Sequence, residues 1–69
     1  MLISEAKTYL GYIVDITYTD RSGKQFCQRA EVFDVGFVPL MGPCLITDAG
    51  ELRLDRVLAC YHSQEQHAA

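Results

Sequence analysis

The alternation of hydrophobic and polar residues is clearest in the segment 12–19. Apolar side chains recur there at every second position, including Val14 and Ile16, and β-branched and aromatic residues predominate. This period of two predicts a β-strand with one buried face. The segment 20–23, which ends in glycine, has the composition of a tight turn. It therefore predicts a hairpin from this strand into a second strand over 24–35.

The second predicted strand carries apolar groups on both of its faces. Phe26, Ala30 and Val32 alternate with a set that includes Cys27 and Phe33. A strand with one buried and one solvated face does not show this pattern, whereas a long strand that bends around a barrel does. The pattern therefore indicates strong curvature in the sheet.

The segment 34–43 is predicted to be irregular, because it contains two glycines and both prolines of the chain. It is nevertheless rich in apolar residues, which loops usually lack. Such a segment either packs as a short edge strand or forms an exposed patch that binds a partner. Both interpretations stay open from the sequence. The residues of the predicted patch are Phe37, Val38, Leu40 and Met41.

The C-terminal half predicts two further strands. A short strand over 44–47 leads through a turn at 48–50 into a strand over 51–61, in which Leu52 and Leu54 fall on the same side. The polar tail 63–69 is expected to fray.

The N-terminal segment 3–11 predicts a short helix. Ser4 is the expected N-cap and Gly11 the expected stop, and Tyr9 and Leu10 are expected to face the body of the domain. A helix of this length is marginal alone and needs to dock on the rest of the chain.

The order of these elements predicts a mainly β fold. A short N-terminal helix followed by four to five short, bent antiparallel strands is typical of a small Sm-like (SH3-type) barrel. We expect a single domain over 1–69, with the helix in 1–11, the barrel in 12–62 and the tail in 63–69.

Composition narrows the classes of partner. The chain has 69 residues, with six Lys and Arg against nine Asp and Glu, and a net charge of −3. This charge weighs against direct nucleic-acid binding and favours a partner protein that is itself basic. A chain this small has a small core, so self-association is a further possibility. An odd number of scattered cysteines, and the lack of a signal peptide or a long apolar run, favour a soluble cytoplasmic protein.

One stretch resembles known families. The run 52–57 (Leu-Arg-Leu-Asp-Arg-Val), with 16–20 (Ile-Thr-Tyr-Thr-Asp) and Gly23 upstream, resembles the Sm-like core of WYL domains. These are bacterial regulatory modules that sense ligands, often nucleotides or nucleic acid. The same run, continued to His62, resembles the Rho-binding antiterminators, small acidic Sm-like proteins that dock on the termination factor Rho and block its RNA site. The resemblance covers residues 12–62, and the net acidity favours the antiterminator type.

Three groups of residues are candidate sites. The first is an acidic face that would meet a basic partner, and the second is the apolar segment named above. The third is an arginine cluster for phosphate or carboxylate groups, since the guanidinium fork suits both; ordinary surface ion pairs are the alternative. The acidic face comprises Asp15, Glu31 and Asp34, and the arginine cluster comprises Arg29, Arg53 and Arg56.

No catalytic or cofactor motif is recognisable. Cys27, Cys44, Cys60 and His62 lack the paired spacing of a zinc site, so we expect buried thiols and no metal. The four tyrosines, Tyr9, Tyr12, Tyr18 and Tyr61, are expected in the core and its rim rather than as a base-stacking platform.

The sequence therefore predicts a non-enzymatic regulator that docks on a basic, nucleic-acid-handling protein and inhibits it. The alternatives are a ligand- or RNA-sensing module that uses the arginine cluster, and a phage-encoded inhibitor of a host defence system.

Overall fold

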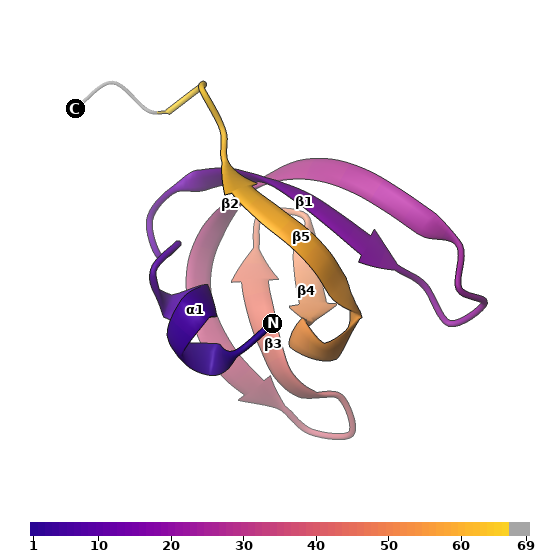
Figure 1. The fold of residues 1–69 in the computed structure, drawn as a ribbon. Coiled ribbons are helices and arrows are strands. Elements are labelled where there is room, and N and C mark those ends of the chain that lie inside the picture. The colour runs from indigo at the N-terminus through magenta and orange to yellow at the C-terminus, as the bar shows by residue number, and fades with distance from the viewer. Residues whose placement is uncertain (67–69) are drawn as a thin grey trace.

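A computed structural model describes residues 1–66 of the chain. It contains one five-stranded antiparallel sheet in the order β4-β3-β2-β1-β5, preceded by one short helix (Figure 1). The predicted mainly β class is confirmed. The elements are α1 (Ile3–Lys7), β1 (Ile13–Thr19), β2 (Gln25–Val38), β3 (Gly42–Thr47), β4 (Gly50–Arg53), the 3₁₀ turn η1 (Leu54–Arg56) and β5 (Val57–His62).

The sheet is strongly curved but is not closed into a barrel. β2 runs through the whole fold, pairs with β1 in its first half and with β3 in its second, and shifts register between Val32 and Asp34. Such an irregularity bends a strand and increases its twist. Within residues 1–66, no ladder joins the two edge strands β4 and β5. Instead η1 links them, and the buried side chain of Leu54 packs into the core beneath that link.

The predicted hairpin of β1 and β2 is present and projects from the rest of the sheet (Figure 1). Asp20 holds its turn, because Oδ1 of this side chain accepts the backbone N–H groups of Ser22 at 2.8 Å and Lys24 at 3.0 Å. Hydrogen bonds, above all that from the Ser22 hydroxyl, lower the pKa of Asp20. Gly23 has φ +86°, a conformation that residues with a Cβ rarely adopt.

The segment 34–43 is not irregular, which corrects the prediction. β2 continues to Val38, a turn occupies 39–41, and β3 begins at Gly42. Val35 pairs with Leu45 across the two strands, and both pack against the core. Burial of this pair outweighs the local signals of glycine and proline.

The predicted strand over 51–61 is also interrupted. η1 separates β4 from β5 because residues 54–56 form a single helical turn. The alternation of the sequence gives no sign of this break. Leu52 on β4 pairs with Leu45, and Leu54, the first residue of the turn, and Val57, the residue after it, are both buried.

The N-terminal helix is shorter than predicted. It ends at Lys7, its N-cap is Leu2 rather than Ser4, and no side chain caps it. Tyr9 faces the body of the domain as expected, and its hydroxyl donates to the carbonyl of Cys60 at 2.9 Å. The expectation for Leu10 was wrong, because its side chain is 40% exposed.

The prediction that the tail frays is wrong for residues 63–66. Ser63 is buried, and its N–H donates to the carbonyl of Ile13 at 2.9 Å. The side-chain amide of Gln66 accepts the N–H of Ile13 at 2.8 Å and donates to its carbonyl at 2.7 Å. These bonds fasten the segment to the start of β1. The rest of the predicted tail, 67–69, lies outside the described residues.

The hydrophobic core lies inside the curve of the sheet and under α1. Two of the three cysteines, Cys44 and Cys60, are buried as expected, but Cys27 is exposed on β2, which corrects the prediction for that thiol. The largest fully buried side chains are Ile16, Leu45, Leu54, Val14 and Val32.

Candidate functional site

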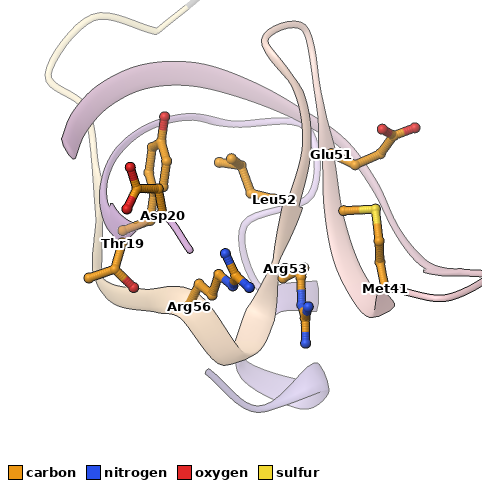
Figure 2. Close-up of a pocket in the computed structure, with 8 residues that line it drawn as sticks. Thr19, Asp20, Met41, Glu51, Leu52, Arg53 and Arg56 are labelled. Atoms are coloured by element: carbon orange, nitrogen blue, oxygen red, sulfur yellow. The ribbon is translucent and has the colours of Figure 1, made fainter. Parts of the chain in front are cut away.

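A hollow of about 180 Å³ opens where the end of β1 approaches β4 and η1 (Figure 2). Its apolar lining comes from Tyr18, Leu52 and Met41, the last of which lies in the turn between β2 and β3. Arg53 and Arg56 line the same hollow, so the structure brings these two predicted residues together.

The two arginines differ in their partners. Nε and Nη2 of Arg53 donate to Oδ1 and Oδ2 of Asp55 at 3.1 and 2.7 Å, which is the paired geometry that suits a carboxylate. This pairing lowers the pKa of Asp55. Within residues 1–66, the guanidinium of Arg56 makes no hydrogen bond and no ion pair. In Figure 2 it extends into the space between Asp20 and Arg53, whereas the guanidinium of Arg53 points away from Leu52.

Arg29, the third predicted member of the cluster, does not line this hollow. It lies on the outer face of the β1–β2 pair, where Nε contacts Oδ1 of Asp15 at 2.9 Å and Nη1 contacts Oε2 of Glu65 at 3.2 Å. The hydrogen bond with Asp15 raises the pKa of Arg29. Sequence reasoning missed Glu65, because nothing local indicates that this segment returns to β2.

The predicted acidic residues of β1 and β2 do share a face. Ile13 pairs with Glu31 and Asp15 pairs with Arg29, so Asp15 and Glu31 project to the same side of the sheet. Arg29 lies beside both of them, and the face therefore carries mixed charge. Asp34 follows the register shift of β2, and its carboxylate accepts the N–H of Val35 at 2.7 Å.

The predicted apolar segment is partly packed and partly exposed. Val38 and Met41 are half-buried, but the side chain of Phe37 is 77% exposed and that of Leu40 is fully exposed. Phe37 also lines a second hollow, of about 330 Å³, between α1 and the β2–β3 pair. Sequence reasoning missed two further residues of this hollow, Ile3 and Pro43, because only the docking of α1 brings them together.

Leu40 lies in an unfavourable backbone conformation. Its φ of +71° is the only positive value among the non-glycine residues that the structure describes. The left-handed region costs an L-residue about 1–2 kcal/mol, because its Cβ approaches the following carbonyl oxygen. Burial does not offset this strain, since the side chain is fully exposed.

We therefore expect Leu40→Gly to raise the free energy of unfolding by about 0.5–1 kcal/mol. Relief of the strain outweighs the added freedom of glycine in the unfolded chain, which amounts to about 0.4–1 kcal/mol. Thermal unfolding followed by circular dichroism tests this. Leu58→Gly, at an exposed leucine of β5, should instead lower the melting temperature; if Leu40→Gly lowers it as well, the strain is not what the geometry indicates.

The ring of His62 packs with two tyrosine rings. His62 lies between the rings of Tyr9 and Tyr12, at centroid distances of 5.0 and 4.8 Å. Tyr12 and Tyr61 are exposed, whereas Tyr9 packs against the core. In the part of the chain that the structure describes, no three His, Cys, Asp or Glu side chains gather as a metal site.

No family model, curated protein or solved structure matches this chain. Among the described residues, no helix has the length and apolar character to cross a membrane.

Proposed function

We propose that this protein is a non-enzymatic regulator that docks on another protein through the apolar end of the β2–β3 pair. The observation that carries the proposal is Leu40, a fully exposed apolar side chain held in a left-handed conformation at the tip of a turn. Glycine or asparagine suits such a position better. A strained and exposed leucine three residues after an exposed phenylalanine stabilises a contact with another molecule, not the isolated fold.

Phe37 and Leu40 supply the apolar part of the contact, from which water is excluded on binding. Burying a phenylalanine or a leucine side chain contributes about 1.5–3 kcal/mol, and buried aromatic side chains are frequent hot spots of binding energy. Ile3 and Pro43 extend the apolar surface around Phe37.

The partner that we propose is a protein with a basic nucleic-acid-binding surface. The chain has a net charge of −3, and Asp15, Glu31 and Glu65 outnumber Arg29 on the outer face of the β1–β2 pair. Complementary charge raises association rates and suppresses wrong partners. The resemblance to Rho-binding antiterminators supports the same class, and docking would inhibit the partner by covering its nucleic-acid site.

Binding to purified Rho, measured by biolayer interferometry at low ionic strength, tests the proposal. We expect the wild-type chain to bind and Phe37→Ala to bind at least about tenfold more weakly, since truncating a hot-spot residue costs about 2 kcal/mol or more. Leu58→Ala, which shortens an exposed side chain on the far edge strand β5, is the matched control and should bind normally.

Two results contradict this proposal. A wild-type chain that forms no complex with Rho at low salt removes the proposed partner. Equal losses for Phe37→Ala and Leu58→Ala remove the proposed surface, because the apolar end of β2–β3 would then be no more important than any other exposed side chain.

A further inference from the structure

We propose that the hollow between β1, β4 and η1 binds a carboxylate that carries a branched aliphatic body, with Arg56 as the partner of the anion. The ligand is a free small acid or the C-terminal carboxylate of a polypeptide, since both present the same chemistry. This site adjoins the docking surface at Met41, but neither Phe37 nor Leu40 lines it.

The first observation is a cation, Arg56, whose donors are not bonded within residues 1–66, although its positive charge contributes to lowering the pKa of Asp20 and of Asp55. Of the two arginines in the hollow, Arg53 donates two hydrogen bonds to the carboxylate of Asp55. The guanidinium of Arg56 has no hydrogen bond or ion pair within residues 1–66. A guanidinium presents a planar pair of donors that matches a carboxylate. Arg56 is also partly buried, which makes its interaction with an anion stronger than at an open surface.

The second observation is the apolar lining beside that cation. Leu52 and Met41 contribute aliphatic and thioether surface, and the ring of Tyr18 contributes a flat wall. The Tyr18 hydroxyl donates to Oε1 of Gln28 at 3.2 Å, and its ring stacks on Phe26 at 5.7 Å. These contacts hold the ring in place. A volume of about 180 Å³ accommodates a branched aliphatic group such as a leucine side chain.

The third observation concerns charge at the rim. Asp20 and Glu51 also line the hollow, and in Figure 2 the carboxylate of Glu51 points outward, away from Leu52. Like charges placed close together repel, so two carboxylates at the rim disfavour an anion of charge −2 such as a phosphate or a dicarboxylate. A monocarboxylate needs one guanidinium and adds only one negative charge. The arrangement therefore selects a monoanion with an apolar body.

A pair of ligands that differ only in the carboxylate tests the site. The ¹⁵N-labelled protein is titrated with N-acetyl-L-leucine and with N-acetyl-L-leucinamide, and the amide signals of Thr19, Leu52 and Arg53 are followed by nuclear magnetic resonance. We expect saturable shifts with the acid and at least about tenfold weaker binding of the amide, because the amide is neutral and loses the charge-assisted hydrogen bonds to Arg56.

A pair of variants assigns the anion to one residue. Arg56→Gln shortens the side chain, keeps a polar end group and removes the charge, and should weaken binding of N-acetyl-L-leucine at least about tenfold. Arg21→Gln, at an exposed arginine in the turn of the β1–β2 hairpin, is the matched control and should bind like the wild type. An unchanged spectrum away from the hollow shows that each variant is folded.

A further comparison of ligands distinguishes a free acid from the C-terminus of a polypeptide. Tighter binding of 4-methylpentanoate than of N-acetyl-L-leucine supports a free acid, and the reverse supports a polypeptide C-terminus. The proposal is overturned if neither acid shifts these signals, if the acid and the amide bind alike, if inorganic phosphate binds as tightly as the acids, or if Arg56→Gln binds like Arg21→Gln.

Discussion

Ile16→Ala is expected to leave most of the protein unfolded at 25 °C. Ile16 lies at the middle of β1, the strand that pairs with both β2 and β5, and its side chain is completely buried. Removing three carbons from such a site costs about 2–5 kcal/mol, because the transfer energy is lost and a cavity remains. A single core in a chain of this size supplies only about 3–5 kcal/mol of net stability.

Urea denaturation followed by circular dichroism measures this loss. Leu58→Ala removes a similar number of atoms from an exposed side chain on β5, and should change the free energy of unfolding by no more than about 0.5 kcal/mol. A midpoint for Ile16→Ala close to that of Leu58→Ala would contradict the position of Ile16 in the core.

Stability is expected to fall steeply between pH 9 and pH 11. Burial raises the pKa of the Cys60 thiol to about 11 from its ordinary value of 9.0. Above pH 9 the unfolded chain gives up this proton while the folded chain keeps it. The unfolded state then binds fewer protons than the native state, so the free energy of unfolding decreases as the pH rises. The contribution of Cys60 to the free energy of unfolding is fully present below pH 9. It is lost progressively as the pH rises to the pKa of this thiol in the folded state.

The expected size of this loss is about 3 kcal/mol for Cys60 over the whole window, since each pH unit in it corresponds to about 1.4 kcal/mol. Two other groups act in the same direction, because burial also raises the pKa of Cys44 and that of Tyr9. Together, Cys60, Cys44 and Tyr9 lower the free energy of unfolding at alkaline pH.

Urea denaturation at a series of pH values from 8 to 11, in the presence of a reducing agent, tests this expectation. The matched variant Cys60→Ala removes the thiol, so its free energy of unfolding should fall less steeply with pH, although Cys44 and Tyr9 retain part of the slope. Parallel curves for the wild type and Cys60→Ala would show that Cys60 does not carry the effect.

Local patterns in the sequence were enough to predict the hairpin in the first half of the chain. The alternation around Ile16 and the Asp20–Gly23 turn predicted the hairpin, because strand pairing across a short turn depends on neighbours in the chain. The same alternation placed Asp15 and Glu31 on one face, since side chains of a strand alternate with a period of two. The mainly β class follows from several such segments in succession.

The tertiary structure decided the features that depend on residues far apart in the chain. Gln66 bonds to Ile13 across 53 positions, and Tyr9 bonds to Cys60 across 51, so neither contact has a local signal. The same holds for the candidate site. Arg53 and Arg56 reach one hollow because η1 turns the chain beside the end of β1, while Arg29 is held elsewhere by Asp15 and Glu65.

The sequence by itself therefore determined which segments form strands and which side chains share a face, because those properties repeat along the backbone. Only the tertiary structure decided that the strand expected over 51–61 breaks at Leu54, that the sheet stays open, and that Leu40 is left exposed. The physical reason is that these features follow from packing against distant elements, which local periodicity does not encode.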